Sequence, residues 1–288
     1  MQRKLHPLER LVAVFALFFV LALSVGFAQA DEIRKQKAVF LRSSSALVLD
    51  AETGEVVINK NGDAVVPIAS ITKLMTAIVT LDRGLELDQR IVLSREDVRT
   101  ARRTHTRLRT GTVLTREELL MLALMASENL AAAALGRTYP GGMEVFVEAM
   151  NAKALELGMS DSRFVEPTGL SPHNVSSALD LAKLVSAAHD YPLIREYSTR
   201  ERATVHSFKR PLTYRNTNNL VRSTYWDIGL SKTGYISQAG RCLVMQVKLG
   251  SKDLIVVLLD SWGKYSRIGD ANRIRKWLET NASAAHSS

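Results

Sequence analysis

The order of apolar and polar positions predicts strands at both ends of the chain and helices between them. Turn residues Ala51–Gly54 separate two short β-branched runs, 46–50 and 55–59, which predicts a hairpin. Three further strand-like runs follow near the end of the chain, around 227–231, 243–249 and 254–260. Short connections within each group indicate antiparallel pairing. We expect the two groups to join in one sheet.

Helical periodicity fills the middle of the chain. Apolar residues recur at helical spacing over 67–81, 143–157 and 180–189, and a last helix is expected over about 271–278. Thr115–Glu118 resembles a capping box that opens one long apolar helix, from Leu119 to about Leu135. The pattern therefore predicts an α+β fold, an antiparallel sheet from both chain ends with a helical region inserted. A site is expected in a cleft between the two.

The first thirty residues have the pattern of a signal peptide. A basic start precedes the apolar run Leu11–Val25, and the small-x-small sequence Ala28–Ala30 follows at once. An uncleaved membrane anchor is the alternative, but the apolar run is short for a full span. We expect export from the cytoplasm, cleavage near Ala30, and one domain over residues 31–288 with at most peripheral membrane contact.

Charge and cysteine content narrow the possibilities further. The formal net charge of +9 favours anionic surfaces, such as cell-wall polymers, acidic lipids or nucleic acid, without choosing among them. Cys242 is the only cysteine, so no intramolecular disulfide can form. Its apolar neighbours predict a buried, inert thiol in a strand.

Three short motifs in fixed order carry the candidate chemistry. The first is Ser70–Lys73, in which a helix places the hydroxyl and the amine on one face. A serine hydroxyl is a weak nucleophile until a base removes its proton, and a desolvated lysine with a lowered pKa can do so. A second Ser-x-x-Lys sequence, Ser261–Lys264, follows a predicted strand and lacks downstream partners, so we discount it.

The second motif, Ser127–Asn129, interrupts the long apolar helix. Polar residues there cost stability unless they are hydrogen-bonded. We expect Ser127 to relay a proton, and Asn129 to hold Lys73 and the substrate backbone. A simple bend or exposed face of the helix is the alternative interpretation.

The third motif, Lys232–Gly234, follows a strand-like run. Lys232 would add positive potential beside Lys73, and Thr233 offers a hydroxyl to a substrate carboxylate or amide. Gly234 allows a substrate backbone to approach closely. The backbone N–H of Tyr235 could complete an oxyanion hole with that of Ser70.

The ordered motifs resemble those of the active-site serine penicillin-binding proteins, in particular the low-molecular-mass D-alanyl-D-alanine carboxypeptidases and endopeptidases. The similarity covers about residues 44–280, and further matches are Glu166–Leu170 with Asn174 and Asp180, Asn216–Leu220, and Lys232–Cys242. Residues 164–171 and the Ser-Glu-Asn form of the second motif are most similar to the short periplasmic murein D,D-endopeptidases. Ile236 is a departure, because the family usually has threonine there, which bears on recognition of the substrate terminus.

The resemblance implies the fold shared by β-lactamases and penicillin-binding proteins, and a peptidase that acts on peptidoglycan peptides without a metal or cofactor. It implies an acyl-ester on Ser70, with Lys73 as general base, Ser127 as the third catalytic group and Lys232 as the substrate-binding cation. β-Lactams would be covalent inhibitors. The resemblance leaves open whether the enzyme trims terminal D-alanine or cuts cross-links.

Two other functions remain open at this point. A serine β-lactamase shares the three motifs, and Glu166 lies where such an enzyme needs a deacylating glutamate. A non-enzymatic polyanion binder would rest on the basic loop 99–112, with Arg99, Arg102, Arg103, Arg107 and Arg109. No nucleic-acid motif with stacking aromatics accompanies that loop. In a peptidase, we expect the loop to flank the cleft and hold anionic glycan strands.

Overall fold

The computed structural model describes residues 39–101 and 106–285, so the predicted signal peptide lies outside the described residues. The described residues belong to two units. The larger, Leu41–Arg275, contains the sheet and the helical region, and the smaller comprises residues 39–40 and 276–285, the latter helical. Within these described residues, no helix is both long and apolar enough to span a membrane.

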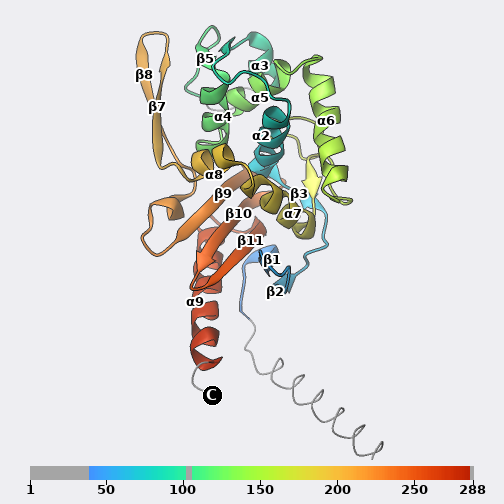
Figure 1. Ribbon diagram of the computed structural model, residues 1–288, viewed down its shortest axis with the longest axis vertical. Coiled ribbons are helices and arrows are strands. Elements are labelled where there is room, and N and C mark those ends of the chain that lie inside the picture. Colours follow the sequence, from blue (N-terminus) through green and yellow to red (C-terminus); the bar gives the residue numbers. More distant parts are fainter. Residues whose placement is uncertain (1–38, 102–105, 286–288) are drawn as a thin grey trace, which may run out of the picture. The chain divides into compact units, whose positions relative to one another are not determined.

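The predicted sheet from both chain ends is confirmed. Five antiparallel strands lie in the order β2-β1-β11-β10-β9, so the N-terminal hairpin joins the C-terminal strands through the β1–β11 pair (Figure 1). Leu47 of β1 lies opposite Val257 of β11, and both are fully buried. The strands of this sheet are β1 (Ser43–Asp50), β2 (Val56–Lys60), β9 (Asp227–Ile236), β10 (Gly240–Leu249) and β11 (Lys252–Ser261).

Helices and short two-stranded ladders make up the rest of the chain. The helices are η1 (Ala69–Ile71), α2 (Thr72–Asp82), α3 (Arg95–Thr100), α4 (Arg116–Met125), α5 (Asn129–Arg137), α6 (Gly142–Glu156), α7 (Ala178–His189), α8 (Pro192–Thr199), η2 (Asn219–Arg222) and α9 (Ser266–Ala285). The ladders pair β3 (Val66–Pro67) with β6 (Val175–Ser176), β4 (Arg90–Val92) with β5 (Val113–Thr115), and β7 (Arg202–Ser207) with β8 (Arg210–Arg215).

Helix α2 lies at the centre of the helical region. Every residue from Thr72 to Thr80 is buried, so the helix is covered on all sides although its sequence includes Lys73 and three threonines. Helix α7 packs against the sheet on one side and against α2 on the other. At the start of α9, the buried Asp270 carboxylate accepts hydrogen bonds from the Ser43 backbone N–H (2.7 Å) and hydroxyl (2.6 Å), which ties this helix to β1.

The helix predicted over 67–81 begins later than expected. Pro67 lies in β3, and the Ile68 N–H donates to the carbonyl of Asn174 at 3.1 Å. A tight 3₁₀ turn then carries Ser70 before α2 begins. Ala69 adopts a left-handed φ of 47°, which an alanine tolerates only when its surroundings fix the backbone.

The single long helix predicted from Leu119 to about Leu135 is wrong. Helix α4 ends at Met125, and α5 begins at Asn129. Between them Ser127 has a left-handed φ of 57°, and the Glu128 side chain caps α5 by accepting from the Leu130 N–H at 3.3 Å. The predicted capping box at the start of α4 is confirmed, with Thr115 as the N-cap and Glu118 as its partner.

Two further elements differ from the sequence prediction. Helix α3 takes in Arg99, which was expected in a loop, and it begins at a capping box between Ser94 and Asp97. The β7–β8 hairpin was not predicted, because its strands are short and mostly polar and carry Pro211. Figure 1 shows this hairpin reaching away from the five-stranded sheet.

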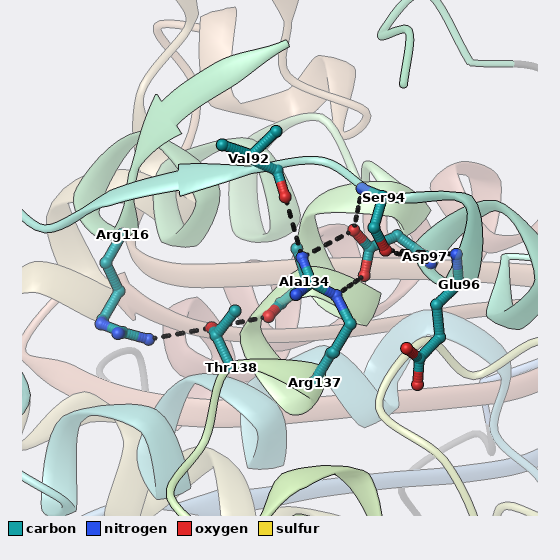
Figure 2. A network of polar contacts seen from close by, with 8 residues as sticks. All are labelled: Val92, Ser94, Glu96, Asp97, Arg116, Ala134, Arg137 and Thr138. Carbon is teal, nitrogen blue, oxygen red and sulfur yellow. Dashed lines mark hydrogen bonds and ion pairs between the residues drawn. The ribbon is translucent and has the colours of Figure 1, made fainter. Parts of the chain in front are cut away.

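A buried ion pair fastens α3 to the end of α5. Figure 2 shows the Asp97 carboxylate facing the Arg137 guanidinium, at 2.7 Å from Nε and 3.0 Å from Nη2. The same carboxylate accepts from the Ser94 N–H at 2.7 Å, and Arg137 also donates to the Val92 carbonyl at 2.9 Å. Because Asp97 is fully buried, its charge depends on these partners.

Replacing Arg137 with alanine should therefore lower the free energy of unfolding by about 2–3 kcal/mol, since it removes two charge-assisted hydrogen bonds from a buried carboxylate. Urea denaturation measures the change. Arg95→Ala, at an exposed position of α3, is the matched control and should stay within about 0.5 kcal/mol of the original protein. Equal effects of the two substitutions would contradict the assigned role of the ion pair.

Candidate active site

Ser70 and Lys73 meet at the amino end of α2, as their spacing predicts. Ser70 lies in η1, and Lys73 lies in the first turn of α2. The Lys73 amine donates to the Ser70 hydroxyl at 2.9 Å. The Lys73 side chain is fully buried, whereas Ser70 is 9% exposed and so reaches solvent at the site.

Two further acceptors surround the Lys73 amine. It donates to the side-chain oxygen of Asn129 at 2.7 Å and to the carbonyl of Thr168 at 2.5 Å. The second motif thus contacts the first, as expected for Asn129. Burial lowers the pKa of Lys73 to about 8, against the opposing effect of the Glu166 and Glu128 carboxylates. A substantial fraction of this amine is therefore neutral near pH 8 and able to take a proton.

Ser127 and Lys232 form the second half of the site. The break between α4 and α5 turns Ser127 toward β9, where its hydroxyl oxygen accepts from the Lys232 amine at 2.9 Å. The left-handed backbone of Ser127 is a strained conformation that this contact and the α5 cap hold in place. Ser127 is therefore neither on an exposed helix face nor part of a simple bend.

Lys232 is the second buried amine of the site. It is 1% exposed, and besides Ser127 it contacts only the Thr233 carbonyl, at 2.9 Å, among the hydrogen-bond partners in the described part of the chain. Burial, together with the positive charges of Lys73 and Arg267, lowers the pKa of Lys232 well below its usual range. The repulsion between the two amines is mutual, so protonation of one disfavours protonation of the other.

Two glycines enclose the backbone of Ser70. A Cβ on Gly234 would lie 3.0 Å from the Ile68 carbonyl oxygen and 3.1 Å from the Ser70 nitrogen, so β9 passes directly beside the Ser70 amide. On the other side, a Cβ on Gly169 would lie 2.0 Å from the Ala69 carbonyl oxygen. A side chain at Gly169 would displace the Ser70 backbone, and one at Gly234 would require it to shift by a few tenths of an ångström.

Thr233 of the third motif and the two residues that follow the motif, Tyr235 and Ile236, have different surroundings. Thr233 donates to the Thr217 hydroxyl at 2.6 Å and is nearly buried. The Tyr235 ring is 55% exposed and lies under the Arg241 guanidinium, with 4.5 Å between the Arg241 Cζ and the ring centroid. Ile236 packs partly buried against the core at the end of β9.

Glu166 is held inside its own loop. Its carboxylate accepts from the backbone N–H groups of Thr168 (2.6 Å), Gly169 (2.7 Å) and Ser171 (3.2 Å), and also from the Thr168 hydroxyl (2.5 Å) and the Asn174 amide (3.0 Å). A carboxylate has about four lone-pair sites, so these donors saturate it. Glu166 thus holds the loop so that the carbonyl of Thr168 lies against Lys73. Its carboxylate has no lone pair left to accept a proton from a water molecule.

Sequence reasoning missed three groups that complete the site. The Thr168 carbonyl gave no signal, because a backbone acceptor has no sequence pattern. Thr217 belongs to the matched stretch Asn216–Leu220, but its place beside Thr233 depends on the tertiary fold. Arg267 belongs to none of the three motifs, yet its guanidinium donates to the Gly234 carbonyl at 2.8 Å.

The described arginines of the basic loop 99–112 belong to different parts of the fold. Arg99 belongs to α3, and Arg102 and Arg103 lie outside the described residues. Arg107 donates to the Thr213 carbonyl at 2.6 Å and stacks over Tyr214, so it joins the loop to β8. The predicted contact of this loop with glycan strands stays a prediction.

Cys242 and possible metal ligands complete the description. Cys242 is fully buried in β10, and burial raises the pKa of its thiol to about 11, which agrees with the predicted inert thiol. In the stretches 39–101 and 106–285, no group of three His, Cys, Asp or Glu side chains could hold a metal ion.

Comparison with known proteins gives a consistent match. The profile of the peptidase S11 family, described as D-alanyl-D-alanine carboxypeptidase, matches residues 32–263. The chain is 47% identical over 279 residues to a D-alanyl-D-alanine endopeptidase of Pseudomonas aeruginosa, covering 94% of this chain and 89% of the relative. It is 44% identical over 277 residues to the Escherichia coli protein of the same name, covering 93% and 88%.

Solved structures agree with the fold. The crystal structure of the Streptomyces K15 DD-transpeptidase superposes with a TM-score of 0.78 at 27% identity, covering 84% of this chain and 98% of that one. The expected α+β fold of the penicillin-binding proteins is thereby confirmed.

The lowered pKa of Lys73 predicts a pH dependence. The rate at which a β-lactam acylates Ser70 should rise with pH and level off above about 8, because only the neutral amine accepts a proton. Glu128→Gln should move the rising part of this pH–rate profile to lower pH, since the Glu128 carboxylate raises the pKa of Lys73. Stopped-flow acylation between pH 5 and 10 measures both, with Glu144→Gln on the exposed face of α6 as control. A pH–rate profile that is the same in Glu128→Gln as in the original protein would refute the electrostatic effect of Glu128 on Lys73.

The glycine enclosure predicts a selective loss of activity. Gly169 and Gly54 both have left-handed φ values, 79° and 72°, but only Gly169 lies against the Ser70 backbone. Gly54→Ala should cost about 1–2 kcal/mol of stability and leave acylation unchanged. Gly169→Ala should also slow acylation by about 10²-fold, because displacement of the nucleophile is costly. Similar acylation rates in the two folded variants would rule out the enclosure.

Proposed function

Since the chain belongs to the D-alanyl-D-alanine carboxypeptidase family, we propose that it hydrolyses murein peptides through an acyl-enzyme on Ser70. The observation that carries the proposal is the fully buried Lys73 amine, 2.9 Å from the Ser70 hydroxyl and with a pKa of about 8. A hydroxyl beside an amine that can be neutral is what nucleophilic catalysis by serine requires when no histidine takes part.

In the acylation step, the Ser70 oxygen attacks the carbonyl carbon of a D-alanine residue. The proton of the Ser70 hydroxyl passes to the Lys73 amine. The developing oxyanion would be held by the backbone N–H groups of Ser70 and Tyr235, because β9 passes beside the Ser70 amide at Gly234. Asn129, Lys232 and Thr233 would bind the substrate around the scissile bond. The C–N bond then breaks, and the acyl group stays on the Ser70 oxygen as an ester.

Ser127 would deliver the proton that the departing amine needs. Its oxygen accepts from the Lys232 amine at 2.9 Å, which leaves its own O–H free to point at the substrate. The proton that Ser127 gives up is replaced through the lysine amines. Water then attacks the ester carbonyl, Ser70 recovers its proton, and the shortened peptide leaves. No step uses a metal or a cofactor.

Cleavage of cross-links is the activity that we propose for this chain. The support is the name shared by the Pseudomonas and Escherichia relatives, both D-alanyl-D-alanine endopeptidases that match over nearly their whole length. Removal of terminal D-alanine uses the same chemistry at the same serine. Such substrates lie in the periplasm, so the proposal includes export of the chain and cleavage of residues 1–30.

A serine β-lactamase is a weaker candidate. It would need Glu166 to activate the deacylating water, but this carboxylate is saturated by donors of its own loop. We expect penicillin to form a long-lived adduct on Ser70. Sustained turnover of nitrocefin by the purified protein would favour the β-lactamase instead.

The test uses a fluorescent penicillin and purified murein. Ser70→Ala should lose covalent labelling and lower peptide hydrolysis by about 10⁴-fold or more. Ser261→Ala, in the second Ser-x-x-Lys sequence, is the matched control and should still be labelled. Chromatography of the digest by the original protein should show that the amount of cross-linked dimers lost exceeds the amount of free D-alanine released. Persistent labelling of Ser70→Ala would overturn the assignment of the nucleophile.

A further inference from the structure

A cationic pocket lies at the base of the β7–β8 hairpin, apart from the catalytic groups. It has a volume of about 310 Å³ and is lined by Glu201, Arg202, Arg215 and Arg222. Glu201 immediately precedes β7, Arg202 begins β7, Arg215 ends β8, and Arg222 ends η2. Three guanidinium groups therefore share this pocket with a single carboxylate.

The arrangement of these arginines is unfavourable without an anion. Arg202 and Arg215 are directly opposite each other in the β7–β8 ladder, where like charges destabilise a hairpin. Among the described residues, neither side chain has a hydrogen-bond or ion-pair partner, and Arg222 donates only to the Asn219 side chain at 2.8 Å. The hairpin thus holds unpaired guanidinium groups together at one end.

The pocket is connected to the catalytic groups through a short, fixed segment. Arg215 and Thr217 are exposed on either side of the buried Asn216, so they share one face of the extended chain. The Thr217 hydroxyl accepts from Thr233 of the third motif at 2.6 Å. Asn216 is held by its N–H to the Glu201 carbonyl at 2.8 Å and by its side chain to the Ser198 carbonyl at 2.9 Å.

We propose that this pocket is an anion subsite that binds a carboxylate of the murein peptide. The inference rests on the proposed function and adds a second point of substrate recognition to it. Arg215 and Thr217 are two positions apart along an extended chain, which is a distance of about 7 Å. A substrate peptide of similar extension would place a carboxylate in the pocket about two residues from the scissile bond.

The chemistry of the pocket fits a carboxylate. Guanidinium groups bind carboxylates through two parallel N–H···O bonds, and several arginines can share one anion. Binding would also remove the repulsion between Arg202 and Arg215. A neutral peptide would gain neither effect, so the subsite discriminates between substrates by charge.

The test compares cross-linked murein dimers that carry free carboxylates with the same dimers after amidation. The double variant Arg202→Gln/Arg215→Gln should cleave the free dimers with a kcat/KM about tenfold lower, through a higher KM, because it loses charge-assisted hydrogen bonds. On amidated dimers it should match the original protein. The double variant Lys209→Gln/Arg210→Gln, an equal charge change at the exposed β7–β8 turn, is the control and should stay within about twofold.

The outcomes separate failure of the subsite from failure of the proposed function. Acylation by penicillin, which lacks these peptide carboxylates, should be unchanged in the double variant and reports that its active site is intact. Equal cleavage of free dimers by the double variant and the original protein would overturn the subsite, as would a loss that persists on amidated dimers. If the original protein cleaves no dimers at all, the proposed function fails instead.

Discussion

The site depends on keeping the amine of Lys73 out of water. An ammonium ion is costly to bury, so burial favours the neutral form that can accept a proton from Ser70. The amine nonetheless needs hydrogen-bond partners, and the Ser70 hydroxyl, the Asn129 amide and the Thr168 carbonyl supply three. All three are neutral groups, which bond the amine without fixing a positive charge on it as an adjacent carboxylate would.

The architecture meets this requirement by bringing distant segments to one point. Helix α2 is buried on all sides, the break between α4 and α5 presents Ser127 and Asn129, and β9 carries Lys232 past the amino end of α2. Strain at Ala69 and Ser127 is part of this arrangement, since both have left-handed φ values. The packing around them stabilises conformations that would otherwise be unfavourable. Gly169 and Gly234 let two segments approach the Ser70 backbone closely, and at Gly169 any side chain would collide with it.

The proposed anion subsite differs from the catalytic site in how its cationic side chains are exposed to water. Within the catalytic site, the two amines are desolvated, and their pKa values fall. The arginines at the base of the β7–β8 hairpin are exposed, and their planar guanidinium groups can each form two parallel hydrogen bonds with a carboxylate. Buried lysines suit proton transfer, whereas exposed arginines suit recognition of a fixed anion. The rigid segment around Asn216 connects these two regions of the fold.

The sequence by itself determined the sheet from both chain ends, the capping box at Thr115, and the pairing of Ser70 with Lys73, because these follow from local periodicity and short spacing. It also indicated the three motifs as one site, through their resemblance to a known family. Only the tertiary structure decided that Ser127 lies in a break between two helices, that the Thr168 carbonyl contacts Lys73, and that Glu166 is saturated within its loop. Those features depend on backbone groups and on contacts between residues far apart in the chain, and neither leaves a pattern in the sequence.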